Sequence, residues 1–246
     1  MSTPTLSAHN LVRTYGPHTV VDHVSFELHR GEVLGFLGPN GAGKSTTMQM
    51  LTGNLAPTAG SIRICGVDLL EHPTTAKAHL GYLPETPPLY RDLTVDEFLT
   101  LAARLHRVAK GQLAAAVEQA KERCGLKKVG KKPIASLSKG YCQRVGIAQA
   151  IVHNPPVVIL DEPTVGLDPL QIREIRSLIR ELGGEHSVIL STHILPEVES
   201  TCDRVQIIND GKLVFQDTLS SLQQRMGSSS LEEVFVQLIV NEEAAP

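Results

Sequence analysis

The sequence lacks an apolar run that could span a bilayer. No charge-free apolar stretch approaches the ~18 residues that a membrane-spanning helix needs, so we expect a chain that does not cross a membrane. The first ten residues also lack the basic start and apolar stretch of a secretory signal. These two absences predict a protein on the cytoplasmic side of the membrane.

Cysteine pairs and a large excess of one charge are missing as well. The four cysteines, at positions 65, 124, 142 and 202, form no CxxC pair, which argues against a structural zinc site or a disulfide framework and predicts reduced thiols. Lys and Arg number 23 against 26 Asp and Glu, so the net charge is −3. Because a nucleic-acid-binding protein usually carries a clear basic excess, we expect no nucleic-acid partner.

The apolar content is high enough for a substantial core. With 246 residues and 41% apolar side chains, the chain fits one α/β unit with a subsidiary lobe. Val33–Leu37 and Val157–Leu160 are continuously apolar, as strands covered on both faces are. Val24–His29 and Ser61–Ile64 alternate between apolar and polar residues, which is typical of half-buried strands.

The composition changes near residue 84, where three prolines mark a connector that cannot be helical. Beyond it, Thr94 and Glu97 fit a capping box that opens a helix. A second helix is expected from about Gln112 to Arg123, and a third from Ser138. We therefore predict an inserted helical lobe at 85–153.

The α/β pattern resumes after this lobe. We expect a helix over 169–182, a strand over 187–190 and a hairpin over 205–215 that turns through Asp210-Gly211. A second capping box, Ser230 with Glu233, predicts a short terminal helix. The resulting division is a core at 1–84 and 154–215, the lobe at 85–153, and a helical extension at 216–246.

A glycine-rich loop follows the first buried strand. Residues 38–45 match G-x-x-x-x-G-K-[ST] and lie between that strand and an expected helix. Glycines let backbone N–H groups approach phosphate oxygens, and the helix directs its positive end at the anion. Lys44 is expected to bridge the terminal phosphates and Ser45 to offer its hydroxyl to Mg²⁺. The alternative is a chance glycine-rich turn, which this strand–loop–helix setting disfavours.

Two acids end the second buried strand. Asp161 is placed at the carboxyl end of a central strand, where open α/β sheets bind ligands, and is expected to hold Mg²⁺. Glu162 is suited to orient or deprotonate a water molecule. On its own such a pair is usually a solvated strand end; together with the phosphate loop it favours phosphoryl transfer.

With these motifs, Leu137–Tyr141 and the Gln143-Arg144 that follow resemble the signature sequence of ATP-binding cassette (ABC) proteins, normally LSGGQ with a trailing QR. Ser138 can cap the helix that begins there, and Gly140 permits close approach, which makes a second anion site. The resemblance covers about residues 5–240. It implies a P-loop NTPase (RecA-like) α/β core with an antiparallel β subdomain and an inserted α-helical subdomain.

The resemblance also implies roles for further residues. Tyr15 stands where the family places an aromatic ring that stacks on adenine, Asp168 lies in the segment that crosses a dimer interface, and His193 resembles the histidine that contacts the γ-phosphate. The family's nucleotide contacts map onto a set within this chain: Tyr15, Gly38, Pro39, Asn40, Gly41, Ala42, Gly43, Lys44, Ser45, Thr46, Ser138 and Gly140. The catalytic set is Lys44, Glu162, Asp168 and His193, and the metal set is Ser45, Glu85 and Asp161. For Glu85 the alternative is an ion pair with a basic residue of the membrane partner.

Departures from the common motifs point to one branch of the family. Lys139 and Tyr141 replace Gly and Gln of the signature, and Glu85 stands where most members carry Gln. Leu-Pro-Glu, Leu-Ser-Lys-Gly-Tyr and Pro-Thr-Val-Gly-Leu-Asp-Pro are shared with ABC-2-type exporters, including gliding-motility-type ATP-binding proteins. The terminal Leu231–Phe235 also resembles the short helix of that branch.

The resemblance implies an ATP- and Mg²⁺-dependent ATPase subunit that pairs with a second copy around two ATP molecules. It would drive a separate transmembrane permease, contacted through the 85–153 lobe, from the inner face of the cell membrane. One alternative is a non-transport ABC ATPase acting on nucleic acid or ribosomes, although no coiled coil, second cassette or zinc cysteines are present. A P-loop GTPase or kinase is the other alternative; it lacks support because no Asn-Lys-x-Asp occurs.

Overall fold

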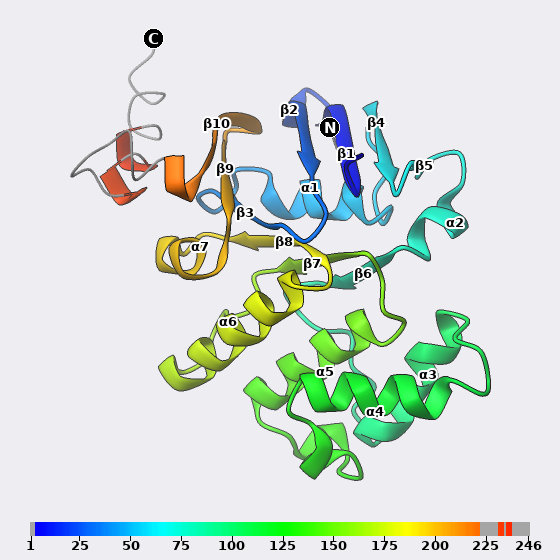
Figure 1. Ribbon diagram of the computed structural model, residues 1–246. Coiled ribbons are helices and arrows are strands. Elements are labelled where there is room, and N and C mark those ends of the chain that lie inside the picture. Colours follow the sequence, from blue (N-terminus) through cyan, green and yellow to red (C-terminus); the bar gives the residue numbers. More distant parts are fainter. Residues whose placement is uncertain (1–2, 222–230, 234, 238–246) are drawn as a thin grey trace.

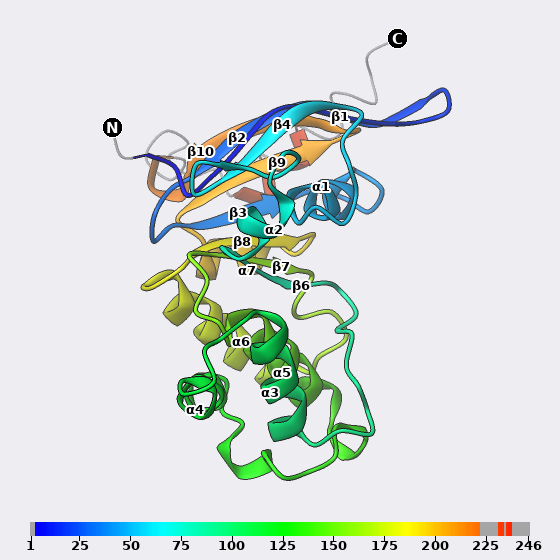
Figure 2. The same ribbon diagram turned by 90° about the vertical axis from the view of Figure 1, so that its right-hand side faces the viewer.

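The protein has two sheets stacked above a group of helices. The computed structural model describes residues 3–221, 231–233 and 235–237. Helix α1 (Lys44–Leu51) lies between the sheets, whereas α3 to α7 lie on the far side of the larger sheet (Figure 1). Figure 2 shows the same layers from the side, with α3, α4 and α5 forming a lobe below the larger sheet. None of the helices formed by the described residues is long and apolar enough to cross a membrane.

The smaller sheet is antiparallel, with the strand order β2-β1-β4-β5. Its strands are β1 (Leu6–Tyr15), β2 (His18–Leu28), β4 (Ala59–Ile64) and β5 (Val67–Asp68). The sequence analysis does not identify β1, because bulges shift its register against β2 and Asn10 adopts a left-handed φ of 47°. Such irregularities break the alternation by which a half-buried strand is recognised.

The larger sheet has the order β10-β9-β3-β8-β7-β6, and all of its strands except β10 run parallel. These strands are β3 (Val33–Leu37), β6 (Leu80–Leu83), β7 (Val157–Asp161), β8 (Ser187–Thr192), β9 (Arg204–Asn209) and β10 (Lys212–Thr218). Every residue of β3, β7 and β8 is buried, because helices and the smaller sheet cover both faces of the larger one. The two apolar runs that predicted central strands are confirmed as β3 and β7.

Two of the three α-helices of the lobe, α3 and α5, begin at a short polar side chain that caps them. The three helices are α3 (Val95–Leu105), α4 (Leu113–Arg123) and α5 (Lys139–Ile151), with 3₁₀ turns at Lys127–Val129 and Ile134–Ser136. The predicted capping box is present: Glu97 N donates to Thr94 Oγ1, and Thr94 N donates to Glu97 Oε2. Ser138 caps α5 by accepting from Tyr141 N. Each such cap stabilises a helix by about 1 kcal/mol.

Outside the lobe, the chain also forms α2 (Pro73–Lys77), α6 (Pro169–Gly183) and α7 (Leu195–Thr201). The apolar core has two parts. One fills the space between the sheets around Phe36 and Met48, and the other lies between the larger sheet and the helices around Leu160 and Ile179. Burying each of these large side chains stabilises the fold by roughly 1.5–3 kcal/mol, so both faces of the larger sheet are held firmly.

The remaining local predictions have mixed outcomes. The β9–β10 hairpin turns through Asp210 and Gly211, which have φ values of 43° and 79°, as the Asp-Gly pair predicts. All four cysteines are free thiols. Ser230 and most of the predicted 216–246 extension lie outside the described residues, so the second capping box stays a prediction.

Candidate functional site

The glycine-rich loop connects β3 to α1 and exposes the start of that helix. Gly43 is the N-cap residue of α1 with φ 100°, and its position has no side-chain cap. A Cβ atom on Gly43 would lie 2.6 Å from the carbonyl oxygen of Val20, so both the backbone angle and the available space require glycine. Uncapped N–H groups at a helix start, together with the helix dipole, favour an anion at this loop.

Lys44 is buried within the loop, with only 5% of its surface exposed. Its Nζ donates to the carbonyl oxygens of Gly38 at 2.8 Å and Pro39 at 3.1 Å. The same ammonium lies 3.6 Å from Glu162 Oε1. Lys44 therefore brings a positive charge into contact with both the loop and the acidic strand end.

Asp161, the last residue of β7, is 3% exposed. Its Oδ1 is buried without a hydrogen-bond partner among the described residues. Burial raises the pKa of this carboxyl, the hydroxyls of Ser191 and Ser45 oppose the rise, and the carboxylates of Glu162 and Glu85 add to it. A buried carboxylate with a free oxygen is an unfavourable arrangement that a cation would relieve.

Glu162 and His193 form the other side of the site. Both carboxylate oxygens of Glu162 face His193 Nδ1, at 3.0 Å and 2.9 Å. Glu162 has a φ of 49°, and its backbone N–H donates to the carbonyl oxygen of Ser191 at 2.9 Å. A left-handed backbone at a non-glycine residue is strained by about 1–3 kcal/mol, and such strain gathers at functional sites.

A single cavity of about 380 Å³ collects most of the predicted site residues. They are Asn40, Gly41, Gly43, Lys44, Ser45, Thr46, Glu85, Glu162 and His193. Val20 and Val165 also line the cavity, and the sequence analysis singled out neither. Gly38 and Ala42 are buried within the loop, and Asp161 is buried outside the cavity lining with a hydrogen bond from the Ser45 hydroxyl.

The strand order explains this convergence. Strand β8 lies between β3 and β7 in the larger sheet. The segments that follow these three parallel strands carry Lys44, His193 and Glu162, and they leave the sheet at the same edge. Because β8 is central, His193 enters the cavity between the phosphate loop and the acids.

Four predicted residues lie elsewhere in the chain. Tyr15 ends β1 and is 46% exposed, with the Arg13 guanidinium 4.5 Å from the centre of its ring. Ser138 and Gly140 line a separate cavity of about 500 Å³. Asp168 caps α6 by accepting from the N–H groups of Leu170 and Gln171, at 3.0 Å and 2.9 Å, a role that the sequence analysis did not assign. Within one copy of the chain, the phosphate loop and the signature residues therefore line two separate cavities.

The two signature departures also have defined surroundings. Lys139, the first residue of α5, places its Nζ against Gly166, which has a φ of 70° and no side chain. Tyr141 is 39% exposed and lines the same cavity as Ser138. Both departures therefore lie on the signature surface rather than in the phosphate-loop cavity.

A buried glutamate next to the site was missed at the sequence level. Glu197 in α7 is 1% exposed and accepts hydrogen bonds from the hydroxyls of Thr164 and Thr192. The available signal was weak: Glu197 follows His193 by four residues, a spacing that many solvated helix residues share. Its burial depends on how α7 packs, which the sequence pattern does not reveal.

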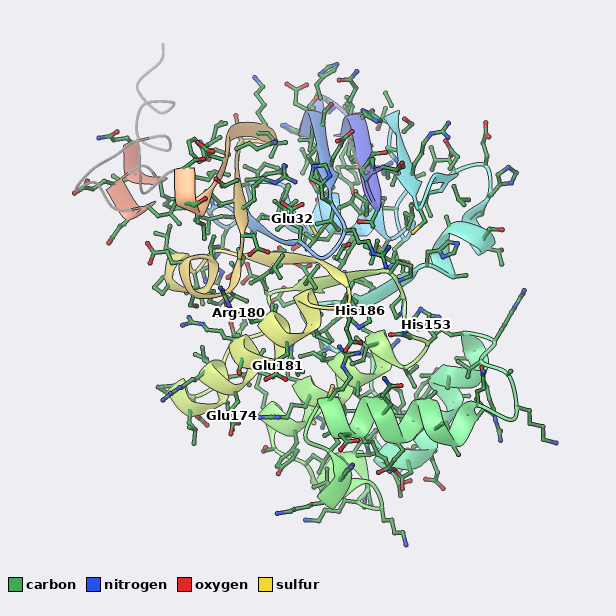
Figure 3. The ribbon with its side chains drawn as sticks, in the orientation of Figure 1. Glu32, His153, Glu174, Arg180, Glu181 and His186 are labelled. Atoms are coloured by element: carbon green, nitrogen blue, oxygen red, sulfur yellow. The ribbon has the colours of Figure 1, made fainter. Side chains whose placement is uncertain are left out.

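A group of histidines lies at the junction between the larger sheet and the lobe. Figure 3 labels His153 and His186 there. The rings of His106 and His153 stack with their centres 3.6 Å apart. Burial is the main reason that the pKa of His153 falls to about 4. His106 and His153 line a different cavity, and none of the three histidines lines the phosphate-loop cavity.

Comparison with known proteins adds independent information. The family described as "ABC transporter" matches residues 21–165. The "Uncharacterized ABC transporter ATP-binding protein YxlF" of Bacillus subtilis (strain 168) is 40% identical over 220 residues, which is 89% of this chain and 73% of that protein. The "Bacitracin transport ATP-binding protein BcrA" of Bacillus licheniformis is 39% identical over 218 residues, covering 88% and 70%.

A solved structure is similar along its whole length. The "Structure of ATP binding subunit of ABC transporter" superimposes with a TM-score of 0.85 and is 35% identical, covering 96% of this chain and 99% of that one. The similarity therefore includes the lobe and both sheets, and not the phosphate loop alone.

Proposed function

The chain belongs to the ABC transporter family as an ATP-binding ATPase subunit, and from this premise we propose that it powers an exporter whose transmembrane part is a separate chain. The similarity to a protein named for bacitracin transport supports export. Such a subunit would work on the cytoplasmic face of the membrane, bound there through its permease partner.

The observation that carries the proposal is the cavity where Lys44, Ser45, Glu162 and His193 meet. ATP phosphates would lie on the N–H groups of residues 40–46, with Lys44 at the β- and γ-phosphates. Gly38, Pro39 and Ala42 would shape the loop from behind. Tyr15 would stack on adenine outside the cavity, where its exposed ring is accessible.

The oxygen atoms around Asp161 fit a magnesium ion. No group of three or more His, Cys, Asp or Glu side chains that could hold a metal occurs in the described part of the chain. Mg²⁺ is commonly held by one or two carboxylates together with substrate phosphates, and the unpartnered Oδ1 of Asp161 suits that arrangement. Ser45 and Glu85 would be the other ligands. The bound ion would neutralise phosphate charge.

Glu162 would orient and deprotonate the attacking water. Its carboxylate is held between Lys44 and His193, so it cannot rotate freely. A fixed acceptor next to the γ-phosphate position gives the water one productive orientation. His193, whose side chain is 40% exposed toward the cavity, would contact the γ-phosphate through its other ring nitrogen.

The separation of Ser138 from the phosphate loop supports a head-to-tail pair of identical chains. Ser138 and Gly140 would close on the ATP that the second copy holds, and Asp168 would cross the interface. A two-fold axis makes two equivalent sites from one kind of contact. ATP binding would close the pair, and hydrolysis would reopen it.

The 85–153 lobe would contact the permease, in the proposed division of core (1–84 and 154–215), lobe and extension (216–246). A cavity of about 440 Å³ at the junction of core and lobe is lined by Tyr82, Pro84, Pro88 and His106 among others. This cavity adjoins the connector that carries Glu85. A permease segment bound in this cavity would contact the connector and would therefore be displaced when Glu85 moves.

Co-purification tests the proposal. The chain should purify with one polytopic membrane protein, and reconstitution with that partner should stimulate ATP hydrolysis. The alternative of a non-transport ABC ATPase predicts stimulation by DNA, RNA or ribosomes instead. Stimulation by nucleic acid without any membrane partner would overturn the transporter assignment.

A further inference from the structure

The buried carboxylate of Glu197 connects the two segments that carry Glu162 and His193. The Thr164 hydroxyl donates to Glu197 Oε1, and the Thr192 hydroxyl donates to Oε2 at 2.7 Å. Thr164 lies two residues after Glu162, and Thr192 lies directly before His193. One side chain therefore holds both segments by hydrogen bonds.

The backbone around His193 is part of the same network. The oxygen of the Thr192 hydroxyl accepts from the backbone N–H of Ile194 at 3.1 Å, while its proton points to Glu197. This fixes the chain on both sides of His193. Arg176 in α6 adds a charge partner, with Nη2 3.7 Å from Glu197 Oε1.

Helix α7 is also attached to the core by apolar side chains, apart from this carboxylate. Val198 is fully buried and lies with Cys202 against Gly35 of β3, where a Cβ atom would come within 3.0 Å of both side chains. A buried charge is costly unless it is paired. The side-chain partners of Glu197 described above lie in the segments that carry Glu162 and His193 and in α6. This arrangement favours a role for Glu197 in aligning these two segments.

We propose that Glu197 is a positioning residue that sets the contact between Glu162 and His193 and thereby the rate of ATP hydrolysis. It acts through the two threonines and does not touch the nucleotide. The inference rests on the catalytic roles proposed above for Glu162 and His193.

The first test replaces the carboxylate by an amide of the same shape. In Glu197→Gln one oxygen becomes an NH₂ group that cannot accept from a hydroxyl, so one threonine bond is lost or must reverse its direction, and the negative charge between the two segments is removed. Misplacing a reacting group by about 1 Å can cost about 100-fold, so we expect kcat to fall about 10- to 100-fold. The Kd for ATP should change less than about threefold, because the phosphate loop is untouched.

Glu199→Gln is the matched control. Glu199 is in the same helix but exposed, so its substitution should leave kcat, ATP affinity and the melting temperature unchanged. A second pair of variants separates the hydrogen bond from packing. Thr164→Val replaces the hydroxyl by a methyl group of similar size and should lower kcat, whereas Thr164→Ser keeps the hydroxyl and should retain most of the activity.

A double-mutant cycle decides whether Glu197 acts through His193. If it does, Glu197→Gln should cost much less kcat in a His193→Ala background than in the wild type. Three outcomes would each overturn the proposal. They are an equal loss of kcat in both backgrounds, a wild-type kcat for Glu197→Gln, and a rise in the Kd for ATP that matches the fall in kcat.

An inactive Glu162→Gln together with a fully active Glu197→Gln would reject the positioning role alone. A Glu162→Gln variant with wild-type turnover would reject the proposed role of Glu162, and the role of Glu197 would fall with it.

Discussion

Substituting Glu162 by glutamine removes one charge and almost nothing else. The amide has the same shape and can still accept from His193 Nδ1, which lies 2.9–3.0 Å from the carboxylate oxygens. Glutamine tolerates a φ of 49° about as well as glutamate, so the backbone strain is unchanged. What is lost is the basic oxygen that we propose lies next to the attacking water.

The size of the effect follows from that loss. General base catalysis contributes about 10²–10⁴-fold, and at about 1.36 kcal/mol per decade this is about 3–5 kcal/mol of barrier. Nucleotide binding should survive, because Lys44 keeps its carbonyl partners at Gly38 and Pro39 and the loop glycines are unaffected. Removing a negative charge 3.6 Å from Lys44 should, if anything, favour the γ-phosphate.

Steady-state phosphate release and gel filtration with ATP are the assays. Glu162→Gln should bind ATP, hydrolyse it very slowly and accumulate as an ATP-dependent dimer, whereas the Glu199→Gln control should behave as wild type. Turnover of Glu162→Gln within about threefold of wild type would refute the assignment, because a general base cannot be replaced by an amide at so small a cost.

Three further predictions concern other parts of the chain. Ser138→Arg should abolish hydrolysis but leave ATP affinity intact at protein concentrations too low for dimerisation. Lys44→Ala should instead weaken ATP binding by the monomer. An equal loss of monomer ATP affinity in both variants would disprove the two-subunit site. Glu85→Gln should keep ATP binding and much of the basal hydrolysis but shift the Mg²⁺ concentration for half-maximal activity, and an unchanged Mg²⁺ dependence would reject its metal role. His153 has a folded pKa of about 4 against an ordinary value of 6.5, so its contribution to stability is full above pH 6.5 and is lost as pH falls toward 4. In urea unfolding, the free energy of unfolding of His153→Gln should therefore fall by about 1–3 kcal/mol less than that of the wild type between pH 7 and pH 4. An equal fall in both proteins would contradict this prediction.

Short-range patterns were enough to predict the phosphate loop. The motif, the continuously apolar strand before it and the helix after it are all local features of residues 33–51. Burial of every residue in β3 then follows from the apolar run. The helix starts at Thr94 and Ser138 were equally predictable, because a cap and its N–H donor lie within three residues of each other.

The meeting of His193 with Glu162 was not predictable from residue patterns alone. It depends on β8 lying between β3 and β7, and the order of parallel strands is a long-range property. The resemblance to ABC proteins supplied the role of His193, but not its hydrogen bonds. Glu197 was missed for the same reason, since nothing local shows that α7 turns this carboxylate inward.

Helix α5 joins the signature to the connector at Glu85 within one packed unit. Two glycines allow this contact: a side chain at Gly81 of β6 would collide with the backbone of Ala150, and one at Gly146 would meet Leu83 and Pro87. Because β6 pairs with β7, the same helix is fixed to the strand that ends at Asp161. A displacement of Leu83 or Pro87, which lie on either side of Glu85, would therefore press on α5 at Gly146. Because Ser138 caps the start of that helix, we expect a movement of the connector to shift the proposed contact with the second ATP.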